Sequence, residues 1–171
     1  MKIFKLLILI SIIFTNNLKA DSPYFIDFKY VLNESTAGKK AQADLKSQLE
    51  KGIASLNKDE KKLQEEEKKL IQQKKIINSD EYKKKVDELR SKVSKLQRDR
   101  QALLNNIANQ RAKARAELLK NLNPILEKYM KEKNIKMIVD KKNLIIATKE
   151  LDLTTDVINL LNGKIKSLNY K

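Results

Sequence analysis

A long stretch without helix-breaking residues constrains this chain more than any other feature of its sequence. Between Gly38 and Asn123 there is no proline and a single glycine, Gly52, while alanine, leucine, lysine, glutamate and glutamine dominate. These residues have high intrinsic helix propensity, so nothing local opposes helix along this stretch. A charged fraction of 35% with an aromatic fraction of only 5% is also typical of long exposed helices. The sequence therefore predicts an elongated helical structure rather than a compact globule.

A polar break near residues 77–80 divides the predicted helix into two arms. Asn78 can cap the second helix, and Glu81, three residues later, completes a capping box and places negative charge in the first helical turn. We therefore predict an antiparallel helical hairpin over residues 36–133 with its turn at this break. An arm of about 40 residues would reach roughly 60 Å.

The two predicted arms carry apolar seams of unequal quality. In the first arm one set of apolar positions recurs every seven residues, but the complementary positions further out are Glu60, Glu67 and Lys74. In the second arm the seam positions alternate by four and three from Tyr82 to Ile107, which indicates a coiled coil. We interpret the thin outer seam as a sign that the tip is flexible, and Gly52 as a position where the helix is locally less stable. A merely weak coiled coil would explain the thin seam equally well, and neutral drift would explain Gly52.

Short apolar segments flank the predicted hairpin on both sides. Residues 24–28 form a β-rich run, so residues 21–35 are expected to contribute an N-terminal strand. Residues 135–140 and 143–148 are typical of two further strands joined by a Lys-Lys pair, and an amphipathic helix follows them. Residues 134–171 would then form a β-β-α unit that makes a small α/β body with the first strand. Such a body buries little surface and leaves two sheet edges open, which oligomerisation would cover.

The first twenty residues have the layout of a secretory signal peptide. Lys2 and Lys5 precede an apolar run from Leu6 to Phe14, and a short polar stretch ends at Ala20. The apolar run is shorter than the roughly 20 residues that a bilayer core requires. We therefore expect residues 1–20 to direct export and to be cleaved after Ala20, with an uncleaved anchor as the alternative.

The absence of two residue types restricts the chemistry that this chain can perform. The sequence contains no cysteine and no histidine, so disulfides, the commonest metal ligand and the usual base near neutral pH are all missing. Asp27 and Asp140 lie near the ends of apolar segments, and we interpret them as strand-end caps rather than as an acid-base pair. No glycine-rich phosphate loop occurs. The sequence therefore predicts a protein that is not an enzyme and has no cofactor or metal.

The formal net charge of +15 would attract anions to the chain. One interpretation is that this charge only keeps a long exposed helix pair soluble. The other is that a basic stretch attracts acidic polypeptide segments or anionic surfaces without providing specificity. Aromatic platforms for bases are missing, so we predict no nucleic-acid partner. The candidate contact residues are Lys83, Lys84, Lys85, Arg98, Arg100, Arg111, Lys113 and Arg115.

Three patches near the ends of the chain match one known family in the same order. The first begins at Phe25-Ile26-Asp27-Phe28, continues with Val31-Leu32 and ends at Gly38-Lys39. The second is Ile138-Val139-Asp140, and the third runs from Leu153 to Ile158. Together they resemble the opening strand, the closing strand and the last helix of the Skp/OmpH family of periplasmic chaperones. The resemblance covers essentially the whole mature chain, although the long helices match only in character.

The resemblance implies an α+β, mostly helical fold in which a long antiparallel coiled-coil hairpin projects from a small β-rich trimerisation body. It also implies a homotrimer and an ATP-independent periplasmic holdase that binds unfolded outer-membrane β-barrel proteins and prevents their aggregation. The candidate core of the body and of its oligomer consists of Phe25, Ile26, Phe28, Ile138, Val139, Leu144 and Ile146.

Two questions stay open alongside this resemblance. Anionic lipid or lipopolysaccharide is a further candidate partner, but residues 61–69 are mixed in sign rather than purely basic. No lipopolysaccharide-binding residue is therefore carried over from the family. The alternative function is that of a structural coiled-coil scaffold in the envelope, without client binding.

Overall fold

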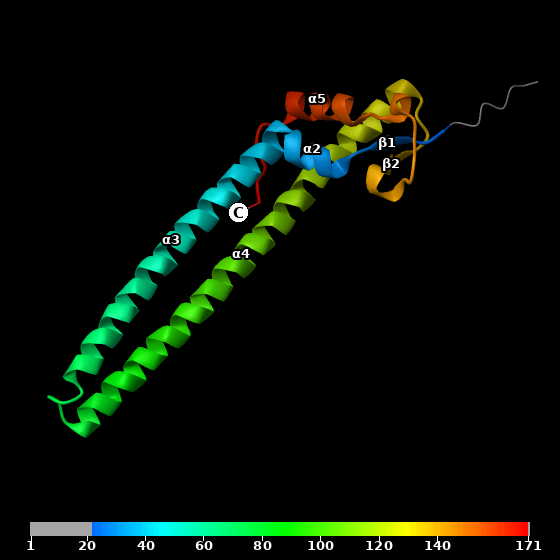
Figure 1. Cartoon of the computed structure of the whole chain (residues 1–171). Coiled ribbons are helices and arrows are strands. Elements are labelled where there is room, and N and C mark those ends of the chain that lie inside the picture. The colour runs from blue at the N-terminus through cyan, green and yellow to red at the C-terminus, as the bar shows by residue number, and fades with distance from the viewer. Residues whose placement is uncertain (1–21, 171) are drawn as a thin grey trace, which may run out of the picture.

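The computed structural model describes residues 22–170, so the predicted signal peptide over residues 1–20 lies outside the described residues. The described part is mostly helical, with two long helices side by side and a small folded body at one end (Figure 1). None of its helices is both long enough and apolar enough to cross a membrane. The elements in chain order are β1 (Tyr24–Ile26), α2 (Phe28–Glu34), α3 (Thr36–Gln73), α4 (Ser79–Lys133), β2 (Ile138–Asp140), the 3-10 turns η1 (Lys141–Asn143) and η2 (Lys149–Leu151), and α5 (Thr154–Lys164).

The two long helices, α3 and α4, form a pair of antiparallel arms (Figure 1). Ser35 caps α3 by accepting a hydrogen bond from the Gly38 backbone N–H. At the far end the predicted cap is present, because the Asn78 side chain accepts a hydrogen bond from the Glu81 N–H at 2.8 Å. These caps satisfy backbone donors that the first turn of a helix leaves without partners. The chain therefore reverses direction between Gln73 and Ser79.

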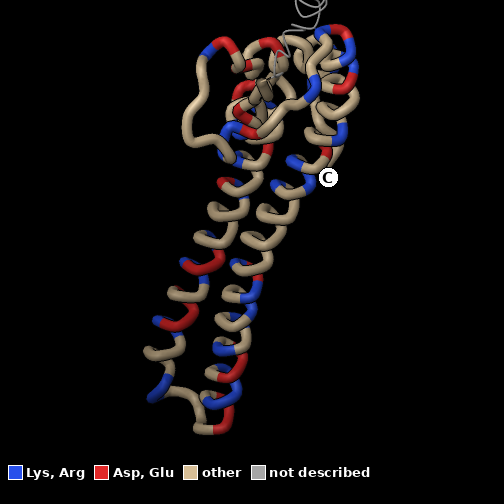
Figure 2. The backbone as a smooth tube through the Cα atoms, turned by 90° about the vertical axis from the view of Figure 1, so that its right-hand side faces the viewer, with Lys and Arg blue, Asp and Glu red and all other residues tan. Residues whose placement is uncertain are grey.

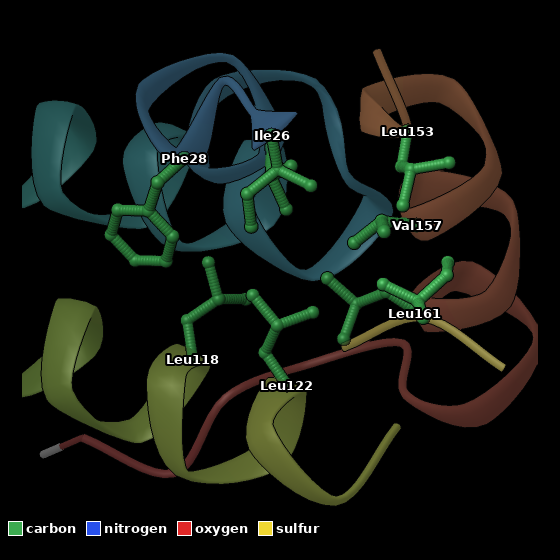
Figure 3. Packing of buried hydrophobic residues seen from close by; sticks show 9 residues of the cluster. Ile26, Phe28, Leu118, Leu122, Leu153, Val157 and Leu161 are labelled. Atoms are coloured by element: carbon green, nitrogen blue, oxygen red, sulfur yellow. The ribbon is translucent and has the colours of Figure 1, made fainter. Parts of the chain in front are cut away.

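The body is built around the end of α4, which continues past the arm and carries two fully buried leucines, Leu118 and Leu122. Side chains from α2 and α5 close over them, and Figure 3 shows Phe28, Val157 and Leu161 among these. Val31, Val157 and Leu161 are also fully buried. The body therefore has an apolar core of its own, and α4 extends without interruption from that core to the tip of the arm.

The small sheet differs from the expectation in its partners. β1 and β2 are parallel, with Phe25 opposite Val139, and a single bridge joins Phe25 to Asp152 on the other side. The expected second C-terminal strand over residues 143–148 is not formed, because residues 141–143 make a 3-10 turn and the next residues have no strand beside them. The prediction of a β-β-α unit at residues 134–171 is wrong in this respect.

The expected N-terminal strand is also shorter than residues 21–35. It ends at Ile26, because the Asp27 side chain accepts a hydrogen bond from the Tyr30 N–H and so starts α2. Phe28 and Val31, three residues apart, are both buried on one face of this short helix. Alternation of apolar residues over Tyr24–Phe28 therefore indicated a longer strand than the cap at Asp27 allows.

Candidate functional site

The outer halves of the two arms enclose an apolar groove that is open to solvent. Its volume is about 740 Å³, and side chains of α3 such as Leu63 and Leu70 line it opposite Val86 and Leu89 of α4. Val93, also in the lining, is 43% exposed. The thin seam that the sequence indicated in this region therefore leaves apolar side chains incompletely covered.

Ion pairs replace apolar contacts where the seam is thin. Arg100 of α4 lies 3.2 Å from the Glu60 carboxylate of α3, and Lys92 lies 2.7 Å from Glu66. All four side chains are 40% exposed or more, so water screens these pairs and each contributes little to stability. The pairs connect α3 and α4 across the outer arms without closing the groove between them.

The predicted basic contacts are divided among several roles. Arg100 pairs with Glu60, Lys85 pairs with Glu81 at 3.0 Å, and the Arg115 guanidinium lies 5.1 Å from the centre of the Phe28 ring. Each of these three side chains therefore has a partner within the chain, although Arg115 is also exposed to solvent. The remaining candidates are exposed to solvent: Lys83, Lys84, Arg98, Arg111 and Lys113.

The exposed basic side chains do not form one continuous patch. At about 100° per residue, Arg111 and Arg115 share one side of α4, whereas Arg98 points to a different side. Basic and acidic residues also alternate along the outer halves of both arms (Figure 2). The sequence analysis groups these residues by linear proximity, which does not place side chains on the same face of a helix, whereas the helical period separates them.

A second apolar surface lies on the body beside β2. A hollow of about 550 Å³ is lined by Phe28, Leu119 and Val139 together with Met137, which is 56% exposed. β1 is the only described strand that pairs with β2, so the other edge of β2 is open. This surface is therefore apolar and adjacent to unpaired backbone hydrogen-bonding groups.

The predicted body residues divide between the interior of this chain and its surface. Three of them are buried, namely Phe25, Ile26 and Phe28. Three are partly buried, namely Ile138, Val139 and Leu144. Ile146 is 90% exposed. Ile146 therefore does not lie in the core of a single chain, and its place in the core of an oligomer stays a prediction. Its neighbour Ile145, for which the sequence predicted no role, is fully exposed.

The two aspartates that were interpreted as caps have local structural roles. Asp27 is the N-cap of α2, and its carboxylate also lies 3.6 Å from the Lys141 ammonium group. Asp140 caps the 3-10 turn η1 by accepting a hydrogen bond from the Lys142 N–H at 3.2 Å. The capping interpretation is confirmed. Over residues 22–170 there is no group of three or more acidic side chains arranged to hold a metal ion.

Comparisons with known proteins agree with this architecture. The chain superposes with a TM-score of 0.80 on the crystal structure of a proposed outer membrane chaperone (OmpH-like) from Caulobacter crescentus CB15. The two chains are 22% identical, and the match covers 88% of this chain and 90% of the other. At this identity the likeness shows a common fold. No curated protein matches the sequence.

The sequence itself matches a family model over most of its length. The family is described as outer membrane protein (OmpH-like), and the match covers residues 24–161. It includes both arms, both strands and most of α5. The resemblance seen in the three terminal patches is therefore confirmed, and the chain belongs to the OmpH-like family.

Proposed function

We propose that this protein is an ATP-independent periplasmic holdase chaperone that binds unfolded outer-membrane β-barrel proteins and prevents their aggregation in transit. Membership of the OmpH-like family supports a chaperone role, and the related structure is that of a proposed outer membrane chaperone. The observation that carries the proposal is the open apolar groove between the arms. An unfolded β-barrel protein exposes apolar strands that pair with one another unless something shields them.

The groove suits many weak contacts rather than one tight site. Its apolar side chains come from several turns of α3 and α4, and Val93 and Ile71 are 43% and 61% exposed. Contacts of this kind lack direction, so clients of different sequence can use them, and their combined strength comes from multivalency. Charged side chains also line the groove, among them Glu60, Glu67 and Arg90, and they would keep the empty arms soluble.

Self-association is part of the proposal. The open edge of β2, the hollow beside it and the exposed Ile145 and Ile146 form apolar surface that a second copy could cover. We propose a homotrimer in which the bodies associate and the arms project around a shared client. Sedimentation of the purified protein measures this directly, and a monomer at micromolar concentration would contradict it.

A light-scattering assay tests the proposed function. An outer-membrane β-barrel protein diluted from urea should stay in solution when the concentration of chaperone trimer is close to that of the β-barrel protein. Val93→Ser should weaken the protection because Val93 lines the groove. Ile53→Ser is a matched control, since Ile53 is also 43% exposed but lies outside the groove lining.

The result also separates the holdase from a structural scaffold. A scaffold would leave aggregation unchanged at any ratio of the two proteins. Equal loss of protection in Val93→Ser and Ile53→Ser would show that the groove is not the client site.

The exposed basic residues are proposed to steer acidic client segments or anionic lipid toward the arms. Reversing Arg98, Arg111 and Lys113 to glutamate should then slow client association and flatten its dependence on salt. Unchanged association kinetics would leave these residues with only a role in solubility.

A further inference from the structure

A short tail follows α5 and returns to the arms. After Lys164 the chain leaves the helix and runs as an irregular segment, residues 165–170, toward α3 and α4. In Figure 1 this red segment descends from α5 along the upper part of the arms. The family match ends at residue 161, so the tail lies beyond the region that the family model describes.

Tyr170, near the end of the tail, is inserted at the root of the arms. Its side chain is only 5% exposed and packs in a cluster with Leu45 of α3 and Ile107 of α4. Ala41 and Ala114 belong to the same cluster, and their small side chains leave room for an aromatic ring beside them. The ring thus packs against both arms at their root.

Packing holds Tyr170 more than hydrogen bonding does. The hydroxyl group donates to the Ala41 carbonyl oxygen at 3.3 Å, which is long for an O–H···O hydrogen bond. Burial of a large side chain contributes more than one weak hydrogen bond of this kind. The ring rather than the hydroxyl group is therefore the main anchor.

Leu168 connects the arm root to the body. It packs against the cluster around Tyr170 and also against the body core that contains Leu118 and Leu161. Ile165, at the start of the tail, packs against the body core as well. The tail therefore ties α5 to both arms through side-chain contacts from a few residues.

We propose that residues 165–170 are a detachable strap that sets the spacing of α3 and α4 at their root and holds α3 against the body and α4. With the strap attached α3 moves together with α4 and the body, and with the strap released α3 can move away from α4. A segment held by so few side chains can open without unfolding the rest of the protein. The inference goes beyond the proposed function, because it concerns how the arms are held whether or not a client is bound.

Distances between spin labels in the purified protein test the strap. The chain has no cysteine, so Asn159→Cys in α5 and Lys51→Cys in α3 introduce one labelled pair at exposed positions. Labelled chains are mixed with excess unlabelled chain to suppress distances between copies. The pair should give a narrow distance distribution with the strap intact and a broad one after removal of residues 165–171 or after Tyr170→Ala.

Two conservative variants keep the comparison valid if the truncated chain fails to fold. Tyr170→Phe retains the ring and should keep the narrow distribution, whereas a distribution as broad as that of Tyr170→Ala would refute the ring as the anchor. Asn169→Ala changes an exposed residue of the same tail and should also have no effect. A narrow distribution in Tyr170→Ala would overturn the proposal.

Hydrogen exchange separates a strap from a segment that only stabilises α5. In Tyr170→Ala the amides of α3 around Ala41 and Leu45 should exchange about tenfold faster or more, while those of α5 stay protected. Faster exchange confined to α5, or no change at the root of α3, would overturn the proposal.

Discussion

Replacing Gly38 by alanine tests how closely α2 approaches the start of α3. A β-carbon at this position would lie 1.9 Å from the Leu32 carbonyl oxygen and 2.9 Å from the Ser35 hydroxyl oxygen. The first of these is a backbone atom that cannot rotate away. The α2–α3 corner would have to shift by more than 1 Å to restore an ordinary contact, and this would disturb the cap at Ser35 and the buried face of α2.

The magnitude follows from two opposing effects. Alanine gains at most about 1 kcal/mol over glycine in a helix, and less near the first turn, where Gly38 lies. Forcing an extra carbon into a packed site costs about 1 to 3 kcal/mol. We therefore expect Gly38→Ala to lower the free energy of unfolding by about 1 to 2 kcal/mol, which is a large share of typical protein stability.

Gly52, in the middle of the same helix, provides the matched comparison. A β-carbon there would lie 2.6 Å from both terminal carbons of Leu103, which belong to a flexible side chain. Moving Leu103 to another rotamer costs about 0.5 to 1.5 kcal/mol, which offsets the gain in helix propensity. Gly52→Ala should therefore change the free energy of unfolding by less than about 1 kcal/mol. Gly52 is therefore a position where α3 and α4 approach each other closely, and not only a position where the helix is locally less stable.

Urea unfolding at one fixed protein concentration measures both effects, since association would otherwise change the apparent stability. In a Leu103→Ala background the obstacle is gone, so Gly52→Ala should stabilise the protein by about 1 kcal/mol. Equal effects of Gly52→Ala in the two backgrounds would show that Leu103 does not oppose it. A neutral or stabilising Gly38→Ala would refute the close approach of α2 and α3.

Three further predictions concern the body core, the arms and the response to pH. Leu118→Ala should lower the free energy of unfolding by about 2 to 5 kcal/mol in the same assay, because Leu118 is fully buried. Arg100→Met should cost no more than about 1 kcal/mol, since its ion pair with Glu60 is exposed; a larger loss would show that the pair is essential. Burial raises the pKa of Tyr170, with a smaller contribution from Asp44, and burial followed by the hydrogen bond to Asp156 raises the pKa of Tyr129. Because the folded state favours the neutral phenols, their contribution to stability should be complete below about pH 10 and fall as the pH rises above that value. Urea unfolding between pH 8 and pH 11 would detect this, and a stability that rises over the same range would contradict it.

The arms could be predicted from sequence because their determinants are local. Helix propensity, the seven-residue repeat and the cap at Asn78 all act within a few turns of one helix. The thin outer seam was also visible, and it corresponds to the groove along the outer arms. The roles of Arg100 and Arg115 were not visible, because each depends on a partner that is distant in sequence.

The tail shows a different limit of sequence reasoning. An amphipathic helix was expected at the end of the chain. α5 ends at Lys164, and Leu168 beyond it packs between the body and the arm root. Tyr170 carried no signal at all, because a single aromatic residue near a chain end has no periodicity. Its site depends on Ala41 and Ala114, which are far apart in sequence but belong to one cluster in the structure.

The strand that was expected over residues 143–148 but not formed supports the proposed self-association. Leu144 and Thr148 have extended backbone angles, and Ile145 and Ile146 are 105% and 90% exposed. A segment with strand propensity forms a strand only beside another strand, and the described part of this chain provides no partner at that place. The open edge of β2 in a second copy would provide one. Replacing both isoleucines by serine should therefore weaken self-association in sedimentation while leaving the helical content unchanged. If the assembly state is the same after this change, the segment does not form the contact between copies.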